Sequence, residues 1–236
     1  MSDVFKNPPP ALSNDYVFDI IKKHYDINPS LTPLVSDRDQ NFKITEEGKS
    51  HIFKIANSAE SKSVLEMQNS ALNYISKKDD SIEIPQPVKT IDGHDILSIQ
   101  ITNTKYYARL LTYVDGVFLK DVKPTNGTTF SVGKFLGYLD KGLAGFNHRA
   151  AKRKFIWDVS QVSLLKSNLT KDDFDLITFF INSFKHDISS LINDFPKTII
   201  HNDGNDHNIL LDSWNRVKGI IDFGDMIHSY RVIEPS

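Results

Sequence analysis

A cluster of acidic and amide side chains near the end of the chain has the residue types that phosphoryl transfer requires. Asn208 follows Asp203 by five residues, and Asp222 follows Asn208 by fourteen residues, at the start of an Asp-Phe-Gly sequence. Phosphoryl transfer from a nucleotide needs a carboxylate that accepts the proton of the acceptor hydroxyl, and hard oxygen ligands that hold magnesium against the phosphates. We expect Asp203 to be the catalytic base, and Asn208 and Asp222 to be the metal ligands.

Two other interpretations of this polar stretch are open. Asn, Asp and Gly are ordinary turn residues, so residues 201–208 are also consistent with a turn between two strands. The second interpretation is a dimetal hydrolase, whose ligands resemble His201, Asp203, Asp206 and His207. Asp203, however, stands where that pattern has a histidine. The apolar flanks, and a hairpin that returns the chain to Asp222, favour phosphoryl transfer because they let three oxygen groups converge. In this interpretation His201 braces the loop and His207 is exposed.

A lysine in the first half of the chain has the position expected of a phosphate-binding residue. Lys54 belongs to an apolar strand pattern, and Glu66 follows twelve residues later on an expected helix. In kinases, a strand lysine that pairs with a helix glutamate positions the α- and β-phosphates. We expect Lys54 and Glu66 to form this pair, with Glu60 as the other candidate partner. The alternative is a lysine whose stem simply lies along a half-solvated strand.

Two more segments are candidates for nucleotide binding. The polar residues 36–42 lie where a loop would cover the phosphates, and they include Gln40 and Asn41. Leu111 and Tyr113 belong to a strand that can offer backbone groups to a purine. We therefore expect these four residues to contribute to the nucleotide site.

The acceptor site is indicated only by acidic residues. Asp158 follows Phe155 and Trp157, a combination that fits either a core aromatic cluster or a site for a cationic substrate group. Asp206 and Asp225 lie beside the catalytic and metal-binding candidates. These three acids are the candidate acceptor-binding residues.

The elements that must position these residues fall into two groups. Apolar periodicity predicts strands at 41–45, 51–56, 96–102 and 106–114, and helices from Ser13 to about Asp26 and from Asn57 or Ser58 to about Lys77. Beyond Val114 it predicts helices at 128–146 and 171–195 and a strand at 198–200. We expect a disordered, proline-rich lead over 1–12, a nucleotide-binding lobe over 13–114 and a catalytic lobe over 115–236.

The composition excludes several other classes of protein. With 28 basic and 30 acidic residues, the net charge of -2 provides no broad electrostatic footprint for nucleic acid or an anionic membrane. The absence of cysteine excludes disulfides and thiolate metal sites, and fits a reducing compartment. No apolar segment has the length of a membrane span or the character of a signal peptide. We expect a cytoplasmic protein whose phosphate binding is local, with no nucleic-acid or membrane partner.

The motif residues also resemble a known family. His201-Asn202-Asp203, Asn208 and Ile221-Asp222-Phe223-Gly224-Asp225 are similar to the signature of the aminoglycoside phosphotransferase and choline kinase superfamily. Within it, residues 13–234 resemble the hydroxylysine kinases and the phosphotransferase domain fused to class III aminotransferases. The resemblance implies an α+β, bilobal protein-kinase-like fold, with a small antiparallel sheet lobe, a helical lobe and a nucleotide between them.

The same resemblance implies roles and ligands. It implies that Asp203 is the base, that Asn208 and Asp222 bind Mg²⁺, and that Lys54 contacts the phosphates of GTP or ATP. The implied acceptor is the hydroxyl of a small amine-bearing metabolite, such as 5-hydroxylysine or a similar amino alcohol. The superfamily usually has glycine where this chain has Asn202.

The end of the chain is a second departure from the family. Relatives continue after the Asp-Phe-Gly sequence with a long helical segment, whereas this sequence stops at Ser236. We therefore expect an incomplete helical lobe, with a continuation or a fusion partner beyond Ser236. The alternative function is a truncated, catalytically weak nucleotide-binding module.

Overall fold

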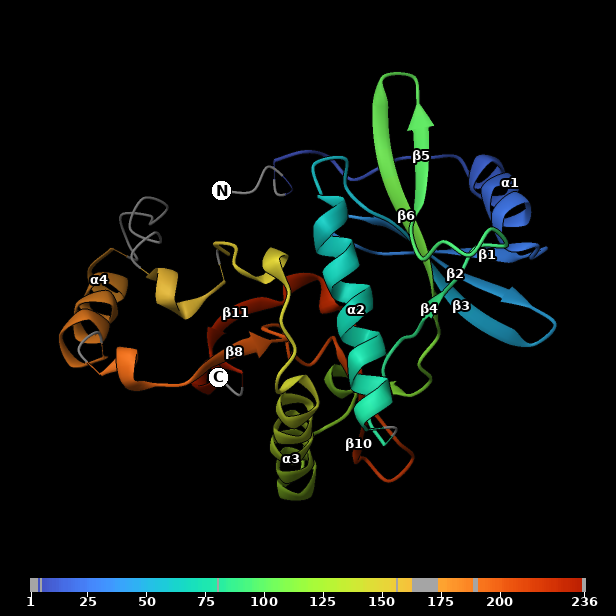
Figure 1. The fold of residues 1–236 in the computed structure, drawn as a ribbon. Helices are drawn as coiled ribbons and strands as arrows, with labels where there is room; N and C mark the ends of the chain where they lie inside the picture. The colour runs from blue at the N-terminus through green and yellow to red at the C-terminus, as the bar shows by residue number, and fades with distance from the viewer. Residues whose placement is uncertain are drawn as a thin grey trace.

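The computed structural model describes residues 4, 6–79, 81–155, 157–162, 174–188 and 191–234. One long helix, α2 (Lys62–Lys78), lies between two groups of elements (Figure 1). An antiparallel sheet and helix α1 (Asn14–Tyr25) lie on one side of α2, and the strands and helices of the second half of the chain lie on the other. This arrangement confirms the expected α+β, bilobal architecture.

The first lobe is built on a six-stranded sheet. Its strand order is β1-β2-β3-β6-β4, and β5 pairs with another part of β6. The sequence did not predict β1, because this edge strand is mostly exposed and contains Pro33, so it lacks an alternating apolar pattern. The strands are β1 (Ser30–Leu34), β2 (Gln40–Glu46), β3 (Lys49–Ile55), β4 (Pro87–Val88), β5 (Leu97–Ile101) and β6 (Thr104–Thr112).

Both helices of the first lobe begin at serine caps. Ser13 caps α1 as expected, by accepting a hydrogen bond from the N–H of Tyr16. Helix α2 is capped by Ser61, not by Asn57 or Ser58. The buried Asn57 amide instead donates to the carbonyls of Asn7 and Pro8 at 3.1 and 3.2 Å. The expected disordered lead is therefore wrong for these residues, which are held against the first lobe.

The second lobe combines short strands with helices. Strands β7, β9 and β10 form one small sheet, and β8 pairs with β11 in another. Helix α4 covers part of the expected helix 171–195, whose residues 171–173 and 189–190 lie outside the described residues. The elements are β7 (Val117–Phe118), α3 (Asn126–Leu143), α4 (Phe174–Ser183), a π turn (Phe184–Ile188), β8 (Lys197–Ile200), β9 (Ile209–Leu211), β10 (Val217–Ile220) and β11 (Ile227–Tyr230), with short 3-10 helices at Leu119–Asp121, Arg149–Ala151, Ile192–Asp194, Phe223–Asp225 and Arg231–Ile233.

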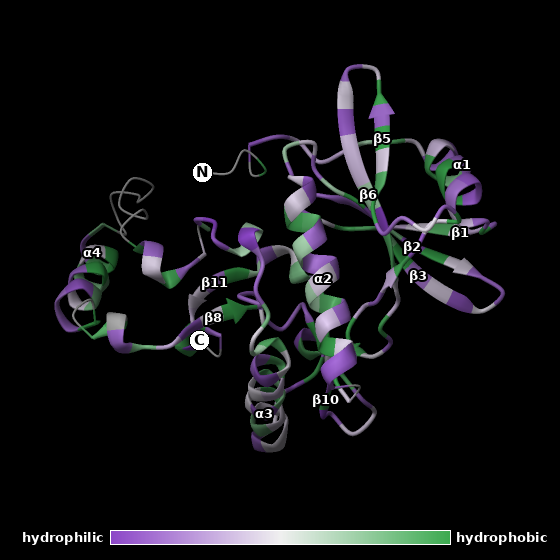
Figure 2. Ribbon diagram, in the orientation of Figure 1, coloured by the Kyte–Doolittle hydropathy of each residue, from purple (hydrophilic) through white to green (hydrophobic). Residues whose placement is uncertain are grey.

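Helix α2 joins the two lobes through a shared core. Hydrophobic and hydrophilic residues alternate along it (Figure 2). Its apolar side chains, including Leu72 and Ile75, lie in one cluster with Leu139 of α3 and Ile209 of β9. The expected boundary near Val114 falls between β6 and β7, but this cluster extends across it, whereas the core between α1 and the sheet is a separate cluster. In the described ranges, no helix is long and apolar enough to cross a bilayer.

A close backbone approach also fixes the second lobe against the first. The N–H of Ile220 donates to the carbonyl of Glu83 at 3.2 Å, beside Gly219. A Cβ atom on Gly219 would lie 2.4 Å from that carbonyl oxygen, closer than van der Waals contact permits. Glycine is therefore required here by the space available.

We expect Gly219→Ala to lower the free energy of unfolding by about 1 to 3 kcal/mol, because the added methyl group forces the two backbones apart. Gly137→Ala on the exposed face of α3 is the matched control. Its Cβ would meet no atom within 4 Å, so the helix should gain about 0.5 to 1 kcal/mol. Chemical denaturation measures both changes, and an unchanged stability of Gly219→Ala would contradict the close approach.

Candidate active site

Asp203 lies in the loop between β8 and β9, with both of its carboxylate oxygens held. The amide of Asn208 donates to Oδ2 at 2.7 Å and to the backbone carbonyl at 2.9 Å. The amide of Asn205 donates to Oδ1 at 2.7 Å. Burial, together with the nearby carboxylates of Asp225 and Asp222, raises the pKa of Asp203 to about 6. The group is thus ionised at neutral pH but more basic than an ordinary aspartate, which suits a proton acceptor.

His201 braces this loop, as expected from the sequence. Its fully buried ring accepts a hydrogen bond from the N–H of Asp203 at Nδ1, at 3.2 Å. Nε2 therefore carries the proton and donates to the carbonyl of Ile221 at 3.1 Å. Burial lowers the pKa of His201 to about 4, so the ring is neutral. Both ring nitrogens are occupied by the backbone, so His201 is not available as a metal ligand.

Asp222 follows β10 and faces the first lobe across a cleft of about 1050 Å³. Its carboxylate lies 3.3 Å from Nζ of Lys54 and accepts a hydrogen bond from the N–H of Gly224 at 3.2 Å. The charge of Lys54, aided by Arg38, holds the pKa of Asp222 well below its usual range. Its backbone has a φ of 60°, in the left-handed region that non-glycine residues rarely adopt. Such strain is concentrated at functional sites.

The donor atoms in this cleft fit a magnesium ion that is shared with phosphates. Asn208 and Asp222 line the same cleft as Asp203 and Lys54. An ionised carboxylate and an amide oxygen are hard ligands, and Mg²⁺ in nucleotide sites uses one or two such groups plus phosphate oxygens. No group of three or more His, Cys, Asp or Glu side chains able to hold a metal is present among the described residues. The dimetal-hydrolase interpretation therefore has no support from the ligand geometry.

Two arginines position the Asp-Phe-Gly-Asp turn. Arg38, from the loop between β1 and β2, lies 2.6 Å from the buried carboxylate of Asp225. Arg153 donates to the carbonyls of Gly224 at 2.5 Å and Met226 at 3.1 Å. The loop that was expected to cover the phosphates is therefore tied directly to the turn that carries Asp222. Neither arginine was singled out from the sequence, because nothing in the spacing indicates contacts over such separations.

The other nucleotide candidates divide into two groups. Asn41, Leu111 and Tyr113 line the cleft. Gln40 is not among the residues that line the cleft, and its amide exchanges two hydrogen bonds with the backbone of Leu12, at 2.8 and 2.9 Å. Glu66 pairs with Lys62 at 3.2 Å on the outer surface of α2. The structure therefore does not form the expected pair between Lys54 and Glu66, because Asp222 is the partner of Lys54.

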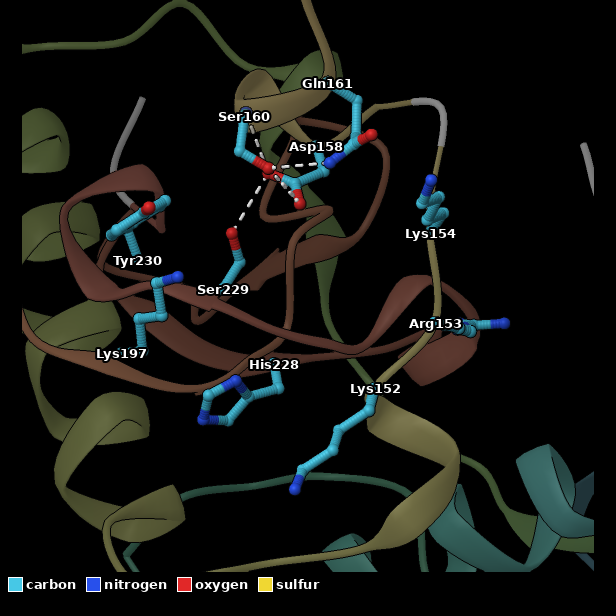
Figure 3. A pocket seen from close by; sticks show the side chains of 10 residues that line it. All are labelled: Lys152, Arg153, Lys154, Asp158, Ser160, Gln161, Lys197, His228, Ser229 and Tyr230. Atoms are coloured by element: carbon cyan, nitrogen blue, oxygen red, sulfur yellow. Dashed lines mark hydrogen bonds between the residues drawn. The ribbon is translucent and has the colours of Figure 1, made fainter. Parts of the chain in front are cut away.

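The acceptor candidates also separate. Asp158 lines a second pocket, where it accepts hydrogen bonds from the hydroxyls of Ser160 at 2.7 Å and Ser229 at 3.0 Å (Figure 3). Its neighbour Trp157 lines the main cleft instead, so the aromatic residue, and not the acid, is the one near Asp203. Asp206 is exposed and pairs with His207 at 2.9 Å. Of the three acids, only Asp225 lines the main cleft.

Glu234 is a further residue that the sequence did not indicate. It is buried, and Oε2 accepts hydrogen bonds from the N–H groups of His201 at 2.7 Å and Asn202 at 3.3 Å. Burial raises the pKa of Glu234 to about 8, and the carboxylates of Asp140 and Asp203 contribute to this rise. Glu234, near the end of the chain, therefore holds the start of the loop that carries Asp203.

The conformation of Asn202 explains why asparagine stands where the superfamily usually has glycine. Its φ is 66°, in the left-handed region. Glycine enters this region without a steric penalty, and asparagine enters it more readily than most other residues. Its side-chain Nδ2 is buried and has no hydrogen-bond partner among the described residues. This position thus supplies a backbone conformation, not a side-chain contact.

Comparisons with known proteins identify the family of the chain. A model of the phosphotransferase enzyme family matches residues 30–234. The hydroxylysine kinase of Xenopus laevis is 31% identical over 263 residues, which cover 97% of this chain and 69% of the relative. The hydroxylysine kinases of Danio rerio and Mus musculus are 29% and 28% identical, and the chain spans 70% and 62% of their lengths.

Solved structures show the same fold. An amicoumacin kinase in complex with AMP-PNP, Ca²⁺ and amicoumacin superposes with a TM-score of 0.73 at 18% identity, covering 94% of this chain and 66% of that one. A microcompartment-associated aminopropanol kinase superposes with a TM-score of 0.72 at 16% identity, covering 92% of this chain and 71% of that one. The family expected from the motif residues is confirmed by the model that matches residues 30–234 and by the 31% identical relative, and the solved structures confirm the fold.

The left-handed backbone of Asn202 predicts a specific order of substitutions. We expect Asn202→Gly to fold with unchanged or slightly raised stability, because glycine tolerates this φ and removes a buried amide without a partner. Asn202→Val should lose about 1 to 3 kcal/mol, because a β-branched residue is strained there. Urea denaturation gives both values, and equal losses in the two variants would show that the side chain matters more than the backbone.

The raised pKa of Glu234 predicts a pH dependence of stability. Between the ordinary value of 4.5 and about 8, the folded state binds more protons than the unfolded state, so the free energy of unfolding falls as pH rises. Glu234→Gln keeps an acceptor oxygen and removes the titration. The free energy of unfolding of the variant, minus that of the unaltered chain, should therefore increase from about pH 5 to about pH 8. The increase should be at most ~1.4 kcal/mol per pH unit. Chemical denaturation at a series of pH values measures this difference. A difference between the two free energies of unfolding that stays constant from about pH 5 to about pH 8 would contradict the assignment.

Proposed function

The chain belongs to the phosphotransferase enzyme family, and we propose that it transfers the γ-phosphoryl group of GTP or ATP to the hydroxyl of a small amine-bearing metabolite. A phosphotransferase with an alcohol group as acceptor agrees with this family and with the hydroxylysine kinases that the chain resembles. The names of those relatives support 5-hydroxylysine or a similar amino alcohol as the acceptor. The name of the aminopropanol kinase, whose fold is shared, is in line with this substrate class.

One observation carries the proposal. The held carboxylate of Asp203 and the ion pair of Lys54 with Asp222 line a single cleft, in which a base, a phosphate-binding cation and a metal-binding acid are close together. A kinase requires this combination, because its catalysis rests on positioning and charge stabilisation. A turn between two strands requires none of it.

The chain's own residues account for each part of the transfer. The acceptor oxygen forms a bond to the γ-phosphorus while the bond from that phosphorus to the β-phosphate oxygen breaks, and the nucleoside diphosphate leaves. Asp203 receives the proton of the hydroxyl. Lys54 orients the donor phosphates, while Asn208 and Asp222 would hold magnesium, which when bound neutralises charge on the phosphate oxygens.

The test is a phosphate-transfer screen of hydroxylated amines, with ATP and GTP in parallel. Asp203→Asn should lower turnover by about 10²- to 10⁴-fold, because the proton acceptor is lost, and should spare nucleotide binding. Asp206→Asn is the matched control: it makes the same change at an exposed acid three residues further on, and should keep near-normal turnover.

Near-normal turnover by Asp203→Asn would overturn the assignment of the base. Magnesium-dependent nucleotide binding without transfer to any hydroxylated amine would support the alternative, a catalytically weak nucleotide-binding module. Phosphorylation of 5-hydroxylysine by the unaltered chain would exclude that alternative.

A further inference from the structure

Arg109 is a buried cation whose hydrogen-bond partners carry no charge. It lies on β6 and is 4% exposed. Its guanidinium donates to Oδ1 of Asn69 at 2.8 Å and to Oε1 of Gln68, and both amides belong to α2. Within the described ranges no carboxylate forms an ion pair with it, and Asp39, Asp222 and Glu60 act on it only over longer distances. Burying a charge is costly unless an opposite charge compensates it.

The position of Arg109 connects it to the proposed phosphate site. Lys54 and Arg109 are directly opposed residues in the pairing of β3 with β6, so their side chains leave the sheet on the same face. Both line the main cleft. Two other cations that line the cleft have acidic partners, since Lys54 pairs with Asp222 and Arg38 pairs with Asp225. Among the residues that the structure describes, the charge of Arg109 has no such direct partner.

We propose that Arg109 is a positioning residue for the phosphate chain of the donor, and that Gln68 and Asn69 hold its guanidinium beside Lys54 without neutralising it. The inference rests on the proposed function, because it takes the ligand of the cleft to be a nucleotide. A carboxylate on α2 would cancel the charge of Arg109, whereas two amides fix its geometry and leave its field for an anion. The phosphate groups supply the missing countercharge, so the contribution of Arg109 to nucleotide affinity increases with the number of phosphates.

The sharpest test turns an amide partner into an acid. Gln68→Glu has almost the same shape and keeps the bond to Arg109, but neutralises its charge. Isothermal titration at a fixed magnesium concentration would compare adenosine, ADP and a non-hydrolysable ATP analogue. The affinity for the ATP analogue should fall about ten-fold, a loss in keeping with one added negative charge nearby. The loss should be smaller for ADP and absent for adenosine.

Two further variants make the result specific. Asn73→Asp makes the same change from amide to acid on the exposed side of α2, and should leave all three affinities unchanged. Asn69→Asp adds the acid at the other partner of Arg109, and should reproduce the pattern of Gln68→Glu if that variant does not fold. The melting temperatures of the nucleotide-free variants report on a purely structural role.

The possible outcomes separate the proposals. Unchanged affinity for the ATP analogue in Gln68→Glu, or an equal loss for adenosine and the ATP analogue, would overturn the role of Arg109. Nucleotide binding by the unaltered chain without phosphate transfer would overturn the proposed function and leave the role of Arg109 intact. No nucleotide binding by the unaltered chain would overturn both.

Discussion

The ion pair between Lys54 and Asp222 is the contact on which the arrangement of the cleft depends. It joins strand β3 of the first lobe to the Asp-Phe-Gly turn of the second, across 168 residues of sequence. The Lys54 side chain is only 11% exposed, so its charge requires a partner. The turn requires restraint because Asp222 has a strained backbone, and Arg153 supplies it by binding the carbonyls of Gly224 and Met226. The contact therefore sets how the sheet faces the catalytic loop.

This contact also separates the properties of two carboxylates that share one cleft. Lys54 keeps Asp222 ionised, which a metal ligand must be. Asp203 has hydrogen bonds from two amides but no cationic partner among the described residues, and burial raises its pKa. One acid is therefore suited to hold a cation and the other to accept a proton, a division of roles that environment alone produces. The formal net charge of -2 gave no sign of it, because the charges that matter are arranged locally.

Helix α2 shows why one part of the site was not predictable. Glu66 was the expected partner of Lys54, but the polar residues of α2 that face the sheet are Gln68 and Asn69, which bind Arg109 of β6. All three are polar and lie within one helical turn, so their pattern does not reveal which of them faces inward. Packing decides this, since the apolar side of α2 is buried together with Gln68 and Asn69, and Glu66 lies beside Lys62 on the outer surface. Asp158 and Trp157 differ in the same way, because adjacent residues face different pockets.

The sequence by itself determined the α+β class and most strands and helices, and it singled out three residues that line one cleft: Asp203, Asn208 and Asp222. These features are local: periodicity reports which side of an element is buried, and a short motif keeps its spacing in any context. Only the tertiary structure decided which cation faces which carboxylate, that Glu234 holds the catalytic loop, and that Arg109 is left with neutral partners. Such contacts join segments that are distant in sequence, and they follow from how lobes and helices pack, which no local spacing encodes.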